Sequence, residues 1–278
     1  HIRSWSKLEF VNIKFYESIV WMRLCTNGCL NNMIIVDGGQ YDQSLLQEKS
    51  TLDHLGKGYT ILPIHGLTAF HPKIILLTNK HSGKIIIGSA NMTAAAFMHN
   101  RELINEFVFD EGDGEDYRYL FKDCWDYIKR VTKDAPPFLK GQLDQLEDTT
   151  PWIQNSGPRK DDFSFISFPH SQDDLNNKVI ESISAVIGSA RIKELTALSP
   201  FFDRDLRSIR FFKEKLGVKK VNLIINPGMV FDNAAKPILK DGVKVFQFDD
   251  PIKKNSHSVL HAKAIYLSTT DGDFILCG

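Results

Sequence analysis

Two short segments of the chain pair a histidine with a lysine two positions later. They are His71 with Lys73, and His261 with Lys263. In each segment an apolar run follows and ends on a glycine 17 positions after the histidine, and the second segment repeats the first at an offset of 190 residues. A neutral imidazole is a nucleophile near its pKa at neutral pH, and an ammonium group is a compact charge suited to phosphate. The two pairs therefore predict one active site built from two similar halves.

Two histidines that face one phosphate can break a phosphodiester without a metal. One imidazole would attack phosphorus and form a phosphohistidine. The other, protonated, would give its proton to the leaving oxygen and then activate water for the second step. The two lysines would stabilise the charge that develops on the phosphate oxygens. We therefore expect no cofactor and no catalytic metal.

The histidine segments occupy matching places in a longer repeat of helices and strands. Before the first segment, hydrophobic periodicity predicts helices at 15–25 and 42–55 and strands at 33–37 and 59–64. Before the second, it predicts helices at 206–216 and 233–240 and strands at 221–226 and 243–248. Strands that alternate with helices are typical of α/β lobes. The predicted fold class is α/β, with two similar lobes, each a mixed sheet covered by helices, related by pseudo-two-fold symmetry.

The stretch between the two copies sets the predicted domain boundary. Periodicity predicts helices at 117–131 and 173–190 and a strand at 194–198, whereas the polar region 138–162 is expected to be an irregular crossing. We place the boundary inside that region. The N-terminal lobe then spans 1–150, and the C-terminal lobe, which contains a shorter copy of the repeat, spans 151–278.

A second motif follows the first histidine segment. Gly88 is followed by Ser89 and Asn91, and Glu102 lies 31 positions after His71. His-x-Lys, Gly-Ser-x-Asn and a downstream glutamate, with a second His-x-Lys at matched spacing, resemble the phospholipase D superfamily of phosphodiesterases. The resemblance covers most of the chain. It implies two phospholipase D-like lobes with the active site in the cleft between them.

The chain departs from this family pattern in the same way in both copies. The family motif has an aspartate seven positions after the histidine, where this chain has Thr78 and Ser268. In lacking that aspartate the chain is similar to tyrosyl-DNA phosphodiesterases and metal-independent restriction endonucleases. The resemblance therefore favours nucleic acid, and DNA above RNA, over lipid. We predict a metal-independent phosphodiesterase that is a nuclease or a DNA-end-processing enzyme.

The resemblance implies a catalytic role for six residues: His71, Lys73, Asn91, Glu102, His261 and Lys263. By analogy His71 is the nucleophile and His261 the general acid and base, although the sequence leaves this order open. Asn91 would join the lysines around the phosphate, and Glu102 would hold the imidazole of the other lobe in one tautomer. By the same spacing a second Asn would fall near position 281 and a second acid near 292, beyond Gly278. Either a longer native protein or an incomplete second half-site is expected.

Composition narrows the class of protein. The 278 residues carry no net charge and are 42% hydrophobic, so a polyanion would have to be held by a local patch of cations. Four cysteines are too few for a disulfide scaffold and indicate reduced thiols in an intracellular, cytoplasmic protein. No apolar run approaches the roughly 20 residues that span a bilayer, so no membrane partner is expected. His257 and His261 are four positions apart, as in a zinc-binding helix, but the glutamate that follows the first histidine of that motif is absent, so no zinc site is expected.

Several alternatives remain open at this level. The chain could be a phospholipase or phosphatidyl transferase, or a non-catalytic nucleic-acid-binding module within a larger protein or complex. Asn91 could cap a helix that begins near Met92, and Glu102 could be a solvated helix residue. The basic run from Arg204 to Lys220 is typical of a solvated helix face and could also track phosphates.

Overall fold

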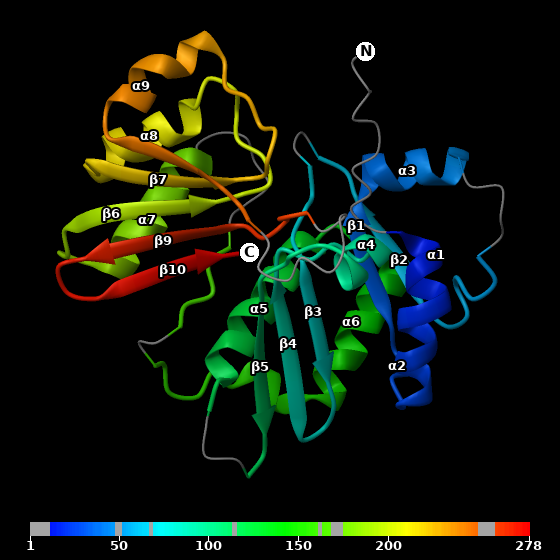
Figure 1. The fold of residues 1–278 in the computed structure, drawn as a ribbon. Helices are drawn as coiled ribbons and strands as arrows, with labels where there is room; N and C mark the ends of the chain where they lie inside the picture. Colours follow the sequence, from blue (N-terminus) through cyan, green and yellow to red (C-terminus); the bar gives the residue numbers. More distant parts are fainter. Residues whose placement is uncertain are drawn as a thin grey trace. The chain divides into compact units, whose positions relative to one another are not determined.

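A computed structural model of the chain describes residues 12–47, 52–66, 69–112, 116–160, 163–167, 175–249 and 259–278. The chain divides into two compact units, whose helices and strands are labelled in Figure 1. The first unit comprises His1–Ile86, Asn91–Thr93 and Asn105–Asp173, and the second comprises Ile87–Ala90, Ala94–Ile104 and Asp174–Gly278. This division differs from the predicted boundary after residue 150. The chain enters the second unit within 87–104 and returns to the first unit before the final crossing.

The first unit contains two small sheets. In chain order its elements are α1 (Ile13–Phe15), η1 (Tyr16–Trp21), α2 (Met22–Thr26), β1 (Met33–Asp37), α3 (Gly38–Gln47), β2 (Thr60–Ile64), β3 (Ile74–Thr78), β4 (Ser82–Gly88), β5 (Ile104–Asp110), α5 (Arg118–Val131), α6 (Pro137–Thr149) and η2 (Pro151–Gln154). β1 and β2 pair in parallel, and the other sheet has the order β3-β4-β5. The predicted helical segments before β1 and after β5, and the predicted strands β1 and β2, are confirmed to within two residues at each end.

Helix α3 begins earlier than predicted, directly after β1. The carboxylate of Asp37 explains this start, because its Oδ1 accepts the Gln40 N–H at 2.9 Å and caps the first turn. The two glycines after Asp37 are therefore the first turn of a helix and not the end of a strand. A Cβ at position 38 would lie 2.4 Å from the ring of His65, so any larger residue there would require that exposed ring to move. Of the rest of the predicted helix 42–55, residues 52–55 are not helical, and 48–51 lie outside the described residues.

The prediction that 138–162 is irregular is wrong for its first part, which forms α6. Leu139, Leu143 and Leu146 recur at i, i+4 and i+7, which places them on one helix face, and proline at the first helical position starts the helix. Leu139 is buried and packs in one cluster with Leu62 of β2. The polar residues between these leucines obscured the pattern.

Helix α5 and the turn η2 cover one face of β4. A Cβ at Gly83 would lie 2.5 Å from the Trp152 ring and 2.7 Å from the Phe121 ring, so only glycine permits this approach. The indole N–H of Trp152 also donates to the carbonyl of Asn79, in the turn between β3 and β4, at 2.9 Å. These contacts hold the hairpin that follows His71.

The second unit is built around one five-stranded sheet. In chain order its elements are α4 (Ala94–Met98), α7 (Leu175–Ile187), β6 (Ile192–Leu198), α8 (Arg207–Leu216), β7 (Lys220–Ile225), η3 (Asn233–Ala235), α9 (Lys236–Lys240), β8 (Val243–Gln247), β9 (Ala264–Thr269) and β10 (Asp273–Cys277). The strand order is β10-β9-β6-β7-β8. β6, β7 and β8 are parallel, whereas β9 is antiparallel to both β6 and β10, so the predicted mixed sheet is confirmed.

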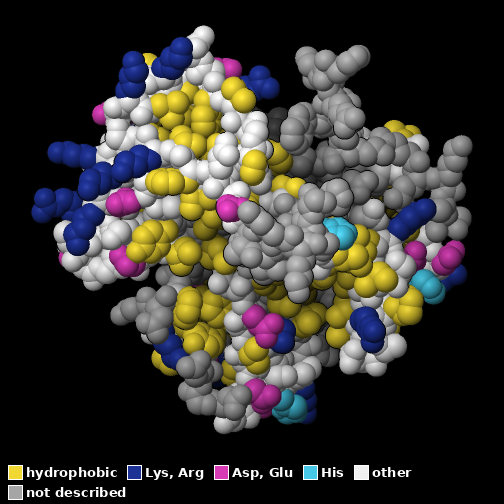
Figure 2. Space-filling view, in the orientation of Figure 1, with side chains coloured by type: hydrophobic (Ala, Val, Ile, Leu, Met, Phe, Trp, Pro, Cys, Tyr) yellow, Lys and Arg dark blue, Asp and Glu magenta, His cyan; other side chains and the backbone are white. Residues whose placement is uncertain are grey.

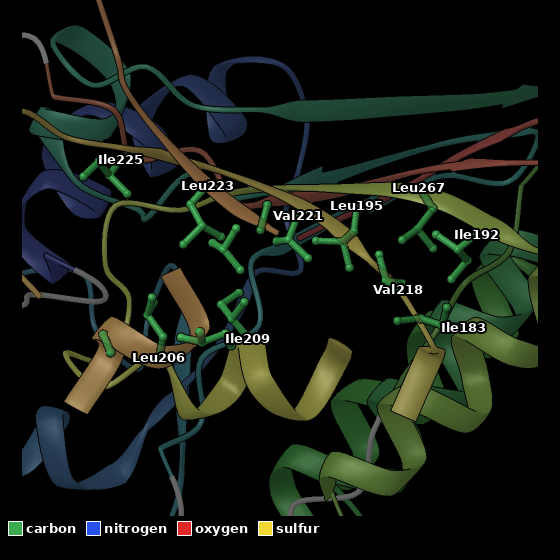
Figure 3. Packing of buried hydrophobic residues seen from close by; sticks show 14 residues of the cluster. Ile183, Ile192, Leu195, Leu206, Ile209, Val218, Val221, Leu223, Ile225 and Leu267 are labelled. Atoms are coloured by element: carbon green, nitrogen blue, oxygen red, sulfur yellow. The ribbon is translucent and has the colours of Figure 1, made fainter. Parts of the chain in front are cut away.

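The core of the second unit lies between this sheet and its helices. Figure 3 shows Leu195, Leu223 and Leu267 of the sheet packed against Ile183 of α7 and Ile209 of α8. The α/β class is thus confirmed in both units, while the pseudo-two-fold relation of the lobes stays a prediction. Among the described helices, none combines the length and the apolar composition needed to cross a membrane.

Replacement of Leu223 by alanine is expected to lower the free energy of unfolding of the second unit by about 2 to 5 kcal/mol, because a fully buried leucine leaves a cavity. Leu223 is 0% exposed and Val230 is 74% exposed, so Val230→Ala serves as the control, with a change within about 0.5 kcal/mol. The four tryptophans all fall within the residues of the first unit, so fluorescence reports that unit and circular dichroism reports both. Urea unfolding should shift the dichroism transition in Leu223→Ala. Equal midpoints for the two variants would contradict this core.

Candidate active site

In the first unit, His71 and Lys73 precede β3 and lie beside Asn91. The Nε2 of His71 lies 3.2 Å from the amide Oδ1 of Asn91, which is buried. The ammonium nitrogen of Lys73 lies 2.9 Å and 3.0 Å from the two ring nitrogens of His71 and donates to the His71 carbonyl at 3.2 Å. An ammonium group can only donate, so this arrangement favours a neutral imidazole. A neutral ring beside a cation is suited to attack on a phosphate anion.

The side chain of Asn91 is turned toward this histidine. Helix α4 begins at Ala94, three positions after Asn91, rather than near Met92. The backbone carbonyl of Asn91 accepts the Thr93 N–H at 2.8 Å, which turns the chain between β4 and α4. The structure thus brings together three of the predicted site residues within the first unit.

In the second unit, His261 forms a buried pair with Glu102. The His261 Nδ1 lies 2.8 Å and 3.0 Å from the two carboxylate oxygens of Glu102, and the side chains are 10% and 5% exposed. The backbone aligns this pair, since the carbonyl of Arg101 accepts the N–H groups of His261 and Ala262 at 2.9 Å and 2.8 Å. Glu102 is therefore not a solvated helix residue. Its carboxylate orients the ring so that Nε2 is the nitrogen left for a substrate.

Two further side chains hold the Glu102 carboxylate. The Ser89 hydroxyl donates to one oxygen at 2.5 Å, and the Asn100 amide donates to the other at 3.1 Å. Burial opposes ionisation of Glu102, but the hydrogen bonds from His261, Ser89 and Asn100 outweigh it, so the pKa of the carboxyl lies below its usual value. Glu102 is thus a carboxylate at neutral pH. Asn100 had no role assigned from the sequence, because its contact becomes visible only in the folded chain.

Lys263 completes the residues around His261. Its ammonium donates to the His261 carbonyl at 3.0 Å and lies 3.4 Å and 3.5 Å from the two ring nitrogens. Burial lowers the pKa of the Lys263 ammonium, and the attraction of Glu102 opposes part of that change. The His-x-Lys segment therefore has the same local arrangement in both units: a lysine folded back onto the carbonyl and ring of the histidine two residues earlier.

No metal centre is evident in the part of the chain that the structure describes. No three His, Cys, Asp or Glu side chains among those residues gather closely enough to hold an ion, and His257 lies outside them. All four cysteines are free thiols. Burial raises the pKa of the Cys124 thiol to about 12, which makes it a poor nucleophile.

The basic run is spread along the second unit rather than gathered at the histidine. In Figure 2 the Lys and Arg side chains lie over this unit at several separate places. β7 begins at Lys220 and ends just before Asn226, whose side chain binds the residue next to His261, so Lys220 lies at the far end of the strand from that histidine. Lys213 is largely shielded from solvent and is paired with Asp241 at 2.6 Å. The other cations of the run are exposed: Arg204, Arg207, Arg210, Lys215, Lys219 and Lys220. Much of the run is thus a solvated face.

An open pocket of about 560 Å³ lies in the first unit, away from the predicted residues. It is lined by residues of the segments 30–32, 56–60 and 137–145. Its polar side chains bind one another: Gln142 donates to Asn31 at 2.6 Å and accepts from Thr60 at 2.6 Å. None of the six predicted catalytic residues lines this pocket, and its polar side chains are occupied by one another. We therefore keep the candidate active site at the two histidines.

Glu102→Gln is expected to lower the free energy of unfolding by about 1 to 3 kcal/mol at pH 7, because charge-assisted hydrogen bonds in a buried site are lost. The pKa of Glu102 is lowered in the folded state, so its contribution is complete above its usual pKa of 4.5 and is lost as pH falls through the lower folded value. The difference between wild type and variant should therefore shrink as urea unfolding is repeated from pH 5 to pH 3. Glu106→Gln, in an exposed pair with Lys84, is the control and should change little at any pH. A difference that is independent of pH would contradict an ionised, paired Glu102.

Comparison with known proteins identifies the fold. No protein-family model matches the chain, and no curated sequence matches it. Among solved structures, the yeast tyrosyl-DNA phosphodiesterase matches with a TM-score of 0.52 and 13% identity, over 88% of this chain and 70% of that chain. A polyphosphate kinase from Porphyromonas gingivalis and a phosphatidylserine synthase from Haemophilus influenzae Rd KW20 each match with a TM-score of 0.40, at 11% and 13% identity, over 88% and 90% of this chain.

The chain spans 32% of the length of the kinase and 66% of the length of the synthase. At identities this low, the similarity concerns the fold. The chain has an α/β fold like that of the yeast tyrosyl-DNA phosphodiesterase, one of the proteins to which its motifs were found similar, so the resemblance holds at the level of fold.

Proposed function

We propose that this chain is a phosphodiesterase that cleaves nucleic acid, with DNA as the preferred substrate, through a phosphohistidine intermediate. The observation that supports this most is the buried hydrogen bond between His261 Nδ1 and the Glu102 carboxylate at 2.8 Å. A carboxylate in that position fixes the tautomer and stabilises the imidazolium form of the ring. A histidine held in this way is suited to donate a proton and take one back.

The first step would use both histidines. A ring nitrogen of neutral His71 attacks phosphorus while the bond from phosphorus to the leaving oxygen breaks. His261, protonated at Nε2, donates its proton to that oxygen, so the leaving group departs as a neutral alcohol. In the second step, neutral His261 takes a proton from water as the water oxygen attacks phosphorus. The phosphorus–nitrogen bond then breaks, and both rings return to their initial states.

Lys73, Lys263 and Asn91 would stabilise the charge on the phosphate oxygens in both steps. Each lysine ammonium lies close to the ring of its own histidine, at 2.9 Å for Lys73 and 3.4 Å for Lys263, so one phosphate can contact a lysine and its histidine together. Charged donors that are already in place are worth most where charge develops in the transition state.

Each predicted catalytic histidine has a hydrogen-bond partner within its own unit. Ser89 hydrogen-bonds to Glu102, which binds His261, and Asn91 contacts His71.

Two points favour nucleic acid as the substrate. The fold is like that of the yeast tyrosyl-DNA phosphodiesterase, and both copies of the motif carry Thr78 or Ser268 in place of the family aspartate. Release of headgroup from phospholipid vesicles, without cleavage of DNA or RNA, would instead favour the lipase alternative. Binding of DNA without turnover would favour a binding module.

Cleavage of end-labelled DNA and RNA oligonucleotides is expected to persist in excess EDTA, because the imidazoles replace a metal-bound nucleophile. His71→Ala should reduce the rate by at least about 10³-fold, as removal of a nucleophile does. His81→Ala is a matched control, since His81 lies in the turn of the same hairpin and its side chain is exposed. Loss of cleavage on chelation would contradict the mechanism, and an unchanged rate in His71→Ala would remove His71 from the site.

A phosphodiester with a good leaving group, such as nitrophenolate, tests the order of the two histidines. His261→Ala should still form an acid-labile, alkali-stable phosphoryl-protein adduct, because that leaving group needs no proton, but should hydrolyse the adduct slowly. His71→Ala should form no adduct. Formation and hydrolysis of the adduct are both measured with labelled substrate in samples quenched at increasing times. The reverse pattern would make His261 the nucleophile.

A further inference from the structure

In the first unit, the residue before His71 is held by a side chain at the end of a neighbouring strand. Asp37 is the last residue of β1, and its Oδ2 accepts the backbone N–H of Phe70 at 2.8 Å. The Phe70 side chain is only 6% exposed. The position just before the histidine is therefore fixed twice, by burial of its ring and by a hydrogen bond to its backbone.

The second unit repeats this arrangement with a different side chain. Asn226 follows the last residue of β7, and its Oδ1 accepts the backbone N–H of Leu260 at 3.0 Å. Its Nδ2 also donates to the carbonyl of Leu260 at 2.8 Å. Leu260, the residue before His261, is only 2% exposed. Both histidines thus follow a buried residue whose backbone is held from the end of a parallel strand.

We infer that Asp37 and Asn226 are positioning residues, which set the place of His71 and His261 through the backbone of the residue before each histidine. Neither belongs to the His-x-Lys or Gly-Ser-x-Asn motifs. The predicted loss of turnover rests on the proposed phosphodiesterase function. The predicted change in the position of each histidine ring does not. A reacting group displaced by about 1 Å can lose about 100-fold in rate, so such a device matters for catalysis.

The chemistry of each partner set explains why one residue is an acid and the other an amide. Asp37 faces two N–H donors, those of Phe70 and Gln40, and a carboxylate supplies an acceptor to each. Asn226 faces one N–H and one carbonyl of Leu260, and an amide supplies one acceptor and one donor. Asparagine at position 37 would place an amide N–H against a backbone N–H, and aspartate at position 226 would place a carboxylate oxygen against the Leu260 carbonyl. The reciprocal swaps Asp37→Asn and Asn226→Asp should therefore fail, although they keep shape.

The test uses the full chain and two main readouts, with the melting temperature as a third for the Asp37 variants. One is the position of the Cε1–H signals of His71 and His261 in a proton–carbon correlation spectrum, assigned by substitution of each histidine. The other is kcat and KM for cleavage of an end-labelled DNA oligonucleotide. Asp42→Ala and Asn233→Ala are matched controls, since both residues are exposed and lie in the same two units.

Asp37→Ala should shift only the His71 signal, and Asn226→Ala only that of His261. Each should lower kcat by about 10- to 100-fold with little change in KM, and the controls should change neither readout. Asp37→Asn and Asn226→Asp should resemble the alanine variants. Asp37→Ser separates two roles of Asp37, because serine still caps α3 but is too short to hold Phe70 as well. It should restore thermal stability toward wild type without restoring kcat.

The outcomes separate this inference from the proposed function. Ring signals that stay in place in both alanine variants, or full recovery of signal and kcat in Asp37→Ser, would overturn it. Simultaneous shifts of both histidine signals in either variant would show general loosening and would also overturn it. If wild type cleaves no nucleic acid but each signal moves as expected, the positioning inference stands and the proposed function fails.

Discussion

The buried hydrogen bond between Glu102 and His261 is the interaction on which the candidate site depends. The two residues are 159 positions apart, and the side chains are almost fully removed from water. A buried carboxylate without partners would carry a large desolvation cost, so the donors around it are required as a group. Ser89, Asn100 and His261 supply them, and hydrogen bonds from two consecutive N–H groups to the Arg101 carbonyl keep the two segments in register.

This constraint explains why 94–104 belongs to the second unit although it lies between β4 and β5. Glu102 can reach His261 only if the chain leaves the first unit after β4 and returns at β5. Gly88 is suited to this exit, since a Cβ there would lie 2.0 Å from the carbonyl of Leu103. The close approach of these two segments lets the Ser89 N–H donate to the Leu103 carbonyl, while the Ser89 hydroxyl accepts the Leu103 N–H and donates to Glu102.

A second constraint is shared by the two units. Each His-x-Lys segment leads into the first strand of a hairpin and follows a buried apolar residue. In each unit, a polar side chain at the end of a parallel strand binds the backbone of that apolar residue. A site that acts on phosphate needs its groups held to within about half an ångström, and rigid strand ends hold a side chain better than free loops. In the second unit, the hydrophobic core in which α7 and α8 pack on the sheet includes Leu223 and Ile225 of β7, the strand that ends just before Asn226.

Much of the fold could be predicted, because it rests on local patterns. Strands β1, β2, β7 and β8 are short apolar runs, and α5 and α8 have a clear helical period. Helix α6 was missed since its three leucines are separated by polar residues, and α3 begins earlier than predicted because Asp37, directly before it, caps its first turn. The same Asp37 carboxylate also binds the backbone of Phe70, 33 positions away. No local pattern shows that one carboxylate serves two elements.

The sequence by itself determined which residues could carry the chemistry: two His-x-Lys pairs, Asn91 and Glu102, at spacings that recur 190 residues apart. Those features can be recognised in the sequence because residue types and strand periodicity are patterns of neighbouring positions in the chain. Only the tertiary structure decided that Glu102 meets His261, that Ser89 and Asn100 hold its carboxylate, and that Asp37 and Asn226 grip the residues before the histidines. These contacts join residues from 2 to 159 positions apart, and a hydrogen bond depends on distance in space, which the packing of the sheets sets.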